Sequence, residues 1–243
     1  MIEDKPLLEV FTTSWNERNT ILELINFYRS LVPDCLIHVQ DNMSTDDTEE
    51  VCKENNVKFT SFDTDNKMDE GVLIKLRNNS WKNSNAHYVI VCDSDELVEV
   101  NKEELLSNLN DIKWTVAKCK GVELFGNDKQ FKDAKYGVFS EGYSKKVLWL
   151  RKAIKESILS PGSHTANFIP NEGFQIIYNE NPPFLYHTKW MDYEYGINRQ
   201  KQIKEKGISK ESKSKGWNFH YSLSEQKHFD YWQKGMKNRK KVR

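Results

Sequence analysis

The stretch Tyr88-Val89-Ile90-Val91-Cys92-Asp93-Ser94-Asp95-Glu96 decides the fold of this chain. Its first five residues are almost wholly apolar, as in a strand that is buried on both faces of a parallel sheet. Upstream, short apolar runs alternate with amphipathic stretches, which is typical of an α/β protein. The sequence therefore predicts the α/β class, with a mostly parallel central sheet. The strands expected in the first half are 7–13, 35–40, 57–62 and 88–92, and the helices are 16–31, 46–55 and 72–81.

Beyond residue 100 the pattern becomes mixed. We expect a helix at 102–109, strands at 114–124, 146–150 and 174–178, loops at 157–171 and 179–183, and polar helical sequence from Tyr193 onward. A chain of 243 residues is long enough for one large domain, so we interpret 1–243 as a single domain. It would comprise a first half at 1–100, an α+β half at 101–198 and a basic helical C-terminal extension at 199–243.

The charges are balanced overall and uneven along the chain. There are 36 basic and 36 acidic side chains, but residues 199–243 carry 14 Lys or Arg against 4 Asp or Glu. The run 234–243 has six basic residues and no acidic residue. We interpret it either as a solvated helix face or as a contact for anionic lipid head groups at the inner face of a membrane. The acidic first 198 residues argue against a nucleic-acid partner.

Neither hydropathy nor cysteine spacing points to a membrane-spanning or secreted protein. No run approaches the roughly 18 apolar residues of a membrane span. The N-terminus lacks the basic and then apolar pattern of a secretory signal. The four cysteines are far apart, which favours reduced thiols over a disulfide framework or a zinc site. We therefore expect a cytoplasmic protein.

Polar residues cluster after three of the predicted strands, at 13–17, 41–48 and 93–96. In an open parallel sheet the ligand site lies outside the carboxyl ends of the strands, so we expect these clusters to converge. The last cluster holds three carboxylates, which would repel one another without a cation. Mg²⁺ and Mn²⁺ prefer a few carboxylates together with water and substrate phosphate. The alternative is an acidic turn that caps a helix.

Taken in order, these clusters resemble the motifs of GT-A fold glycosyltransferases, specifically the family 2-like group of nucleotide-diphospho-sugar transferases. The matching segments are Thr13-Ser14-Trp15-Asn16-Glu17 for the first-strand motif, Asp41-Asn42-Met43-Ser44-Thr45-Asp46-Asp47-Thr48 for the D-D-G-S-T-D-G-T turn, Leu76-Arg77-Asn78 for A-R-N and Asp93-Ser94-Asp95 for D-x-D. Met43 and Asp47 stand where the family has glycine. The resemblance implies a Rossmann-like GT-A domain with a nucleotide-sugar-binding first half and an acceptor-binding second half.

The resemblance also implies a donor pocket. Thr13, Trp15 and Asp41 would line the site of the nucleotide base and ribose. Arg77 would lie near the ribose or diphosphate, and Asp93 would contact the ribose or a metal-bound water. For each there is a structural alternative: Trp15 as a core aromatic, Arg77 as a surface ion pair, and Asp41 as a turn or helix-cap residue.

Metal ligation is implied in the same way. Asp95 would ligate Mn²⁺ or Mg²⁺, with Asp93 beside it. A histidine from the second half commonly completes the metal shell in this fold. His164, on a Gly-Ser loop, is the first candidate and His187 the second. A hydrogen-bonded structural histidine is the alternative for both.

The implied reaction is an inverting single displacement. The donor would be a nucleotide-diphosphate sugar, with a UDP-sugar favoured by family frequency, and the acceptor a glycan, a lipid-linked sugar or a glycoprotein. A divalent metal would stabilise the leaving diphosphate, and a carboxylate would act as general base. Glu141, in a loop-like segment, is our first candidate, with Glu123, Glu172 and Asp192 as rivals. A solvated loop charge is the alternative for Glu141.

Two other enzyme classes fit the same residues less well, and a non-catalytic function is the remaining alternative. The strand ending in Asp93 resembles the start of haloacid-dehalogenase phosphatases, but Leu97 stands at their Thr or Val position and their later acidic pair is missing. Sugar nucleotidyltransferases would need a Gly-rich basic loop at 13–17, which is absent. A non-catalytic carbohydrate- or nucleotide-sugar-binding module on the GT-A fold stays open as the alternative function.

Overall fold

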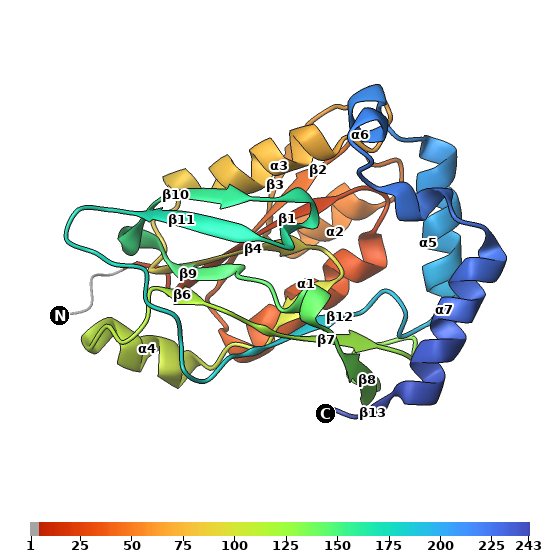
Figure 1. Cartoon of the computed structure of the whole chain (residues 1–243). Coiled ribbons are helices and arrows are strands. Elements are labelled where there is room, and N and C mark those ends of the chain that lie inside the picture. The colour runs from red at the N-terminus through yellow and green to blue at the C-terminus, as the bar shows by residue number, and fades with distance from the viewer. Residues whose placement is uncertain (1–4) are drawn as a thin grey trace.

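A computed structural model describes residues 5–243 of the chain. Its larger sheet has six strands in the order β3-β2-β1-β4-β9-β6. β3, β2, β1 and β4 run parallel, whereas β9 is antiparallel to both β4 and β6. The strands are β1 (Leu8–Ser14), β2 (Leu36–Asp41), β3 (Lys58–Ser61), β4 (Tyr88–Asp93), β6 (Val116–Ala117) and β9 (Leu148–Leu150). The predicted α/β class with a mostly parallel central sheet is confirmed (Figure 1).

Helices connect the parallel strands as predicted. α1 (Arg18–Leu31), α2 (Thr48–Glu54) and α3 (Glu70–Asn79) follow β1, β2 and β3. Residues three and four apart share one helix face, so the sequence predicts an apolar face of Ile21, Leu24, Ile25, Tyr28 and Leu31. In α1 the first four are buried and Leu31 is half-buried. α3 begins after Asp69, whose carboxylate accepts a hydrogen bond from the Val72 amide.

A second, five-stranded sheet has the order β13-β8-β7-β12-β5. Its strands are β5 (Glu96–Val98), β7 (Lys120–Leu124), β8 (Tyr136–Phe139), β12 (Phe184–His187) and β13 (Lys240–Lys241). β12 pairs parallel with β7 and antiparallel with β5. Because β5 begins at Glu96, directly after β4, the acidic cluster at 93–96 forms the corner between the two sheets.

The chain ends in helices that run along one side of the molecule. These are α5 (Tyr193–Lys206), α6 (Lys210–Ser214) and α7 (Glu225–Asn238), drawn in blue in Figure 1, whereas α4 (Lys102–Asn110) lies elsewhere. The short 3-10 helices are η1 (Ser80–Asn83), η2 (Glu141–Tyr143), η3 (Arg151–Ala153), η4 (Pro161–Ser163) and η5 (Phe219–Ser222). α7 packs through Trp232 and Met236 onto a small apolar cluster around Phe125 and Trp190.

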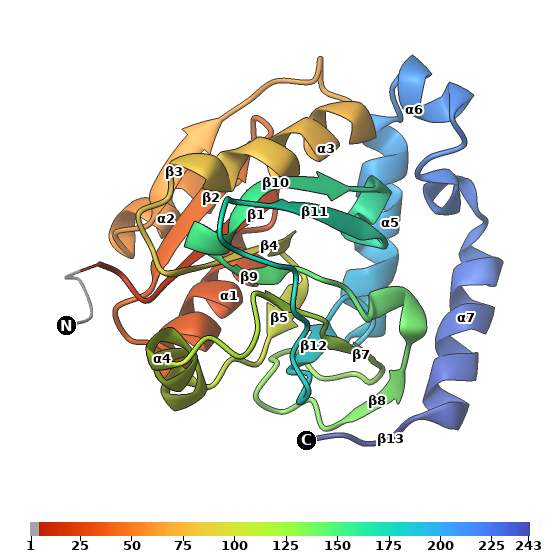
Figure 2. The same cartoon turned by 60° about the vertical axis from the view of Figure 1, so that its left-hand side comes forward.

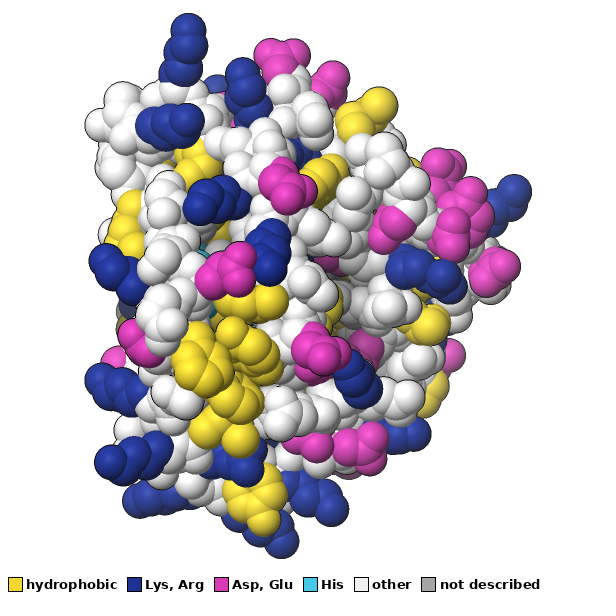
Figure 3. All heavy atoms as spheres, turned by 90° about the vertical axis from the view of Figure 1, so that its right-hand side faces the viewer, with side chains coloured by type: hydrophobic (Ala, Val, Ile, Leu, Met, Phe, Trp, Pro, Cys, Tyr) yellow, Lys and Arg dark blue, Asp and Glu magenta, His cyan; other side chains and the backbone are white. Residues whose placement is uncertain are grey.

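The basic end of the chain is partly engaged with the protein itself. Arg239 donates a hydrogen bond to the Phe125 carbonyl at 2.8 Å, and Arg243 donates one to the Phe131 carbonyl at 2.6 Å. Over the face that α5 to α7 present, basic and acidic side chains are intermixed around a patch of hydrophobic ones (Figure 3). Contact of the run 234–243 with a membrane stays a prediction. Among residues 5–243, no helix combines the length and the apolar character that a membrane crossing requires.

Two expectations about the second half are wrong. Residues 157–171, expected as a loop, largely form an antiparallel hairpin of β10 (Ile154–Leu159) and β11 (Ala166–Pro170), which packs beside α3 (Figure 2). The Gly, Pro and Ser signal belongs to its turn, where Gly162 has a φ of 58°. Residues 174–178 form no strand beyond a bridge at Tyr178, because the Ile177 backbone bonds the Thr115 side chain and backbone instead.

The expected strand at 114–124 divides between the two sheets, as β6 and β7.

The cysteines were expected as free thiols, and the structure agrees. All four are free and buried.

Candidate active site

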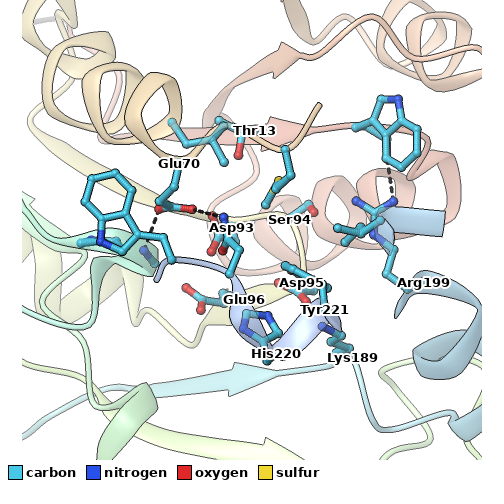
Figure 4. Close-up of a pocket in the computed structure, with 18 of the residues that line it drawn as sticks. Thr13, Glu70, Asp93, Ser94, Asp95, Glu96, Lys189, Arg199, His220 and Tyr221 are labelled. Carbon is cyan, nitrogen blue, oxygen red and sulfur yellow. Dashed lines mark hydrogen bonds between the residues drawn. The ribbon is translucent and has the colours of Figure 1, made fainter. Parts of the chain in front are cut away.

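A cavity of about 350 Å³ opens where β1 and β4 end. α3, η4, the end of β12, α5 and the segment 216–221 complete its wall. Figure 4 shows Asp93, Asp95 and Glu96 grouped together, with Lys189 and Tyr221 beside Asp95. Side chains from distant parts of the chain therefore converge at this edge of the sheet. The predicted site residues that line the cavity are Thr13, Trp15, Arg77, Asp93, Asp95, His164 and His187.

Asp93 belongs to a buried ion-pair chain. Its carboxylate accepts a hydrogen bond from Arg77 Nη2 at 2.6 Å, and Arg77 Nη1 donates to Glu70 at 2.7 Å. Burial by itself would raise the pKa of Asp93, but the cations of Arg77 and Lys145 hold that pKa below its ordinary value. Arg77 is 4% exposed, so it is a buried residue of the cavity wall and no surface ion pair. Glu70, its second partner, has no motif in the sequence to mark it.

Asp95 contacts His187. The distance from Asp95 Oδ2 to His187 Nε2 is 3.3 Å, and the imidazole stacks on the Tyr143 ring with centroids 4.1 Å apart. Burial opposes the charged forms of both groups, yet their attraction lowers the pKa of Asp95 and, together with Glu123, raises that of His187 to about 9. His187 is thus the histidine that the fold brings to the acidic cluster.

Asp95 and His187 could supply part of the ligand set of a divalent cation. Within residues 5–243, no three His, Cys, Asp or Glu side chains form a complete metal cage. The Asp95 carboxylate and the His187 imidazole, 3.3 Å apart, are the groups that would hold such an ion. A carboxylate and an imidazole suit Mn²⁺ or Mg²⁺ when phosphate and water supply the other positions.

His164 also faces the cavity, as a second histidine against the Tyr143 ring. It is exposed, and its Nδ1 lies 2.8 Å from the Gly142 carbonyl oxygen. Partial burial of the imidazole ring and the nearby Lys145 cation lower the pKa of His164. The ring contacts Tyr143 edge-on, at 6.2 Å between centroids. His164 therefore lines the cavity, whereas no ion pair links it to Asp95.

Two lysines of the cavity form no ion pair among residues 5–243. Lys189, 7% exposed, has its ammonium 4.9 Å from the Tyr221 ring centroid. Lys206 lies 3.8 Å over the Trp15 ring, and its Nζ is buried with no hydrogen-bond partner in the described chain. Burial lowers the pKa of both, that of Lys206 to about 8. The other cavity cations are paired: Arg77 with Glu70 and Asp93, Lys145 with Glu96, and Arg199 with Glu17.

Trp15 is therefore no core aromatic. Its ring lies under Lys206 and 5.4 Å from the Arg199 guanidinium, whose Nη1 donates to the Trp15 carbonyl. Asp41 is buried and does not line the cavity; it accepts hydrogen bonds from the amide and hydroxyl of Ser44. Met43, in the same turn, adopts a φ of 55°, a left-handed conformation that glycine takes more readily than other residues.

None of the four candidate bases lines the cavity among the described residues. Glu141 is exposed on η2, and Glu172 lies in a turn. Asp192 caps α5 and pairs with Lys129. Glu123 is buried behind His187, at 3.4 Å from its Nδ1.

Sequence reasoning missed the cations and acids that α5 and its neighbours supply. Glu17 is the last residue of the motif at 13–17 and had no role assigned to it, and Lys189 lies two residues after His187; these positions were the available signal. Lys206 and Tyr221 come from the segment 199–243, which the sequence presents as a basic extension. In the structure this segment forms part of the cavity wall.

No family model and no curated protein matches the chain. Solved structures are similar to it at low identity. S. aureus TarS 1–349 in complex with UDP-GlcNAc is 17% identical over 82% of this chain and 69% of that chain, with a TM-score of 0.43. A mannosyltransferase from Pyrobaculum calidifontis with GDP-Man and Mn²⁺ is 16% identical over 47% of this chain, with a TM-score of 0.35.

A third similar structure is glucosyl-3-phosphoglycerate synthase from Mycobacterium tuberculosis with Mg²⁺ and UDP, at 20% identity over 49% of this chain and 44% of that chain, with a TM-score of 0.34. The alignments span only 35% of the mannosyltransferase and 41% of a longer TarS structure. These TM-scores are all below 0.5, so the similarity to these structures carries no argument about the function of this protein.

Proposed function

We propose that this protein is a glycosyltransferase that moves a sugar from a nucleotide-diphosphate donor to an acceptor hydroxyl. One observation carries the proposal: the Lys189 side chain and the Lys206 ammonium nitrogen are buried, neither lysine forms an ion pair among the described residues, and both line a cavity with Asp93 and Asp95. A buried cation without an ion-pair partner is stabilised by an anionic ligand. A diphosphate carries the negative charge that would neutralise the two lysines. A UDP-sugar is the first donor to test.

For the donor, we propose that Trp15 and Thr13 contact the nucleotide base. The base would stack against the Trp15 indole, which Lys206 and Arg199 hold in place. Asp41 does not line the cavity, and its role would be to fix the conformation of the turn at 41–48 through its hydrogen bonds to Ser44. Arg77 would hold Asp93 toward the ribose.

For the metal, we propose that Asp95 and His187 hold Mn²⁺ or Mg²⁺, with Asp93 beside them. His164 is the alternative histidine ligand. The ion would supply electrostatic stabilisation of the leaving diphosphate. The protein's own contribution is Lys189, whose ammonium is held next to Asp95 in a poorly solvated wall, where a charge acts more strongly than in water. Inverting single displacement stays part of the proposal.

Glu141 remains our proposal for the general base, under one condition. Its carboxylate is exposed on η2 and does not line the cavity, so it meets the acceptor hydroxyl only if the acceptor extends over Gly142 and His164. Such an extended acceptor, a glycan, a lipid-linked sugar or a glycoprotein, is what the proposal requires.

The test is sugar release from UDP-, GDP- and dTDP-sugars, with and without Mn²⁺. Asp95→Ala should abolish release of the one accepted sugar, because it removes the carboxylate that we place on the metal. Asp111→Ala, at a side chain that is 80% exposed, is the matched control and should behave as wild type. Glu141→Gln should retain donor hydrolysis and lose transfer to an acceptor by about 100-fold.

The result that would contradict the proposal is absence of donor cleavage and of donor binding in the presence of metal. Donor binding without cleavage would instead favour the binding-module alternative.

A further inference from the structure

His187 lies between two glutamates of the second sheet. β12 places it opposite Glu123 of β7 and opposite Glu96 of β5. Its Nδ1 and Glu123 Oε1 are both buried, have no hydrogen-bond partner among the described residues, and lie 3.4 Å apart. The Tyr143 ring, stacked on the imidazole, restricts the plane in which His187 can turn.

The second oxygen of Glu123 is held by α7. Tyr231 Oη donates a hydrogen bond to Glu123 Oε2. α7 reaches this position because Gly235, one turn further along, packs directly on the Phe125 ring; a Cβ there would lie 2.3 Å from it. A continuous polar chain thus runs from Tyr231 on α7 through Glu123 and His187 to Asp95.

We propose that Glu123, held by Tyr231, is the positioning residue that presents His187 Nε2 to the ligand site at Asp95. With Nδ1–H donating to Glu123, Nε2 faces Asp95 Oδ2 and is the nitrogen that would exchange its proton for a metal ion. A carboxylate behind a ligating histidine sets its tautomer and orientation and raises its basicity. The inference rests on the proposed metal-dependent function, and it makes α7 part of the active site.

The inference is tested by two measurements on the full chain. The first is the affinity for Mn²⁺ in the presence of UDP. Glu123→Ala should weaken it by about 10- to 100-fold. Glu123→Gln, which keeps an oxygen to accept the Nδ1 proton, should lose less, and Tyr231→Phe should also lose affinity. Glu99→Gln is the control, since Glu99 accepts a hydrogen bond from Tyr186 at 2.9 Å, on the opposite face of β12.

The second measurement needs no metal. A long-range ¹H–¹⁵N spectrum, assigned with His187→Gln, should show the Nδ1 proton of His187 in the wild type, retained in Glu123→Gln and in Glu99→Gln and lost in Glu123→Ala. If Glu123→Ala leaves the His187 signals and the Mn²⁺ affinity within twofold of wild type, the inference is overturned. If wild type binds no Mn²⁺ with UDP, the proposed metal role fails, and the imidazole spectrum decides the inference alone.

Discussion

At the scale of the residue, we expect binding of the proposed donor to depend on pH through Lys206. Burial and the Arg199 cation lower its pKa to about 8, against the opposing effect of the Asp41, Asp63 and Glu17 carboxylates. The ammonium is charged below that pKa and neutral above it. We therefore expect UDP affinity to fall as pH rises from 7 to 9, by up to about tenfold if the cation contributes about 1.4 kcal/mol.

Calorimetric titration of UDP at both pH values measures this effect. Lys206→Arg should remove most of the fall, because a guanidinium stays charged over that range. Lys204→Arg, at an exposed position on the same helix, should leave it unchanged. An equal fall in wild type and Lys206→Arg would refute this role for Lys206.

At the scale of the element, the packing of α7 depends on a glycine. Ala normally stabilises a helix interior relative to Gly by about 1 kcal/mol. At Gly235 the added methyl would meet the Phe125 ring, so we expect Gly235→Ala to destabilise the protein by about 1–3 kcal/mol. Urea unfolding measures the difference. Lys234→Ala, exposed on the same helix, should stay within about 0.5 kcal/mol of wild type, and a Gly235→Ala protein as stable as that control would contradict the packing argument.

At the scale of the whole molecule, the cavity joins residues from both halves and from 199–243. Ligand binding should therefore stabilise the chain as one unit. UDP with Mn²⁺ at 100 times its Kd should add about 2.7 kcal/mol, which corresponds to a rise in Tm of roughly 5–10 °C in a single transition. Calorimetry should show no comparable rise in Asp95→Ala. Two separate transitions, with only one of them shifted, would contradict a site shared by the whole chain.

The local sequence determined the first half of the fold. The buried stripe of α1 and the apolar strand at 88–92 follow from periodicity, which neighbours along the chain can satisfy. The clusters at 13–17 and 93–96 could be placed at one cavity, because parallel strands share a carboxyl edge. Beyond residue 100 this logic weakens, since the hairpin at 154–170 and β12 form by pairing with strands that are distant in sequence.

What only the tertiary structure decided is which side chains complete the site. His187 rather than His164 lies against Asp95, because β12 pairs with β5, the strand that begins one residue after Asp95. Lys206 reaches Trp15 only because α5 packs back over the end of β1. Such long-range contacts leave no local pattern: hydrophobic periodicity records which face of an element is buried, and not which element covers it.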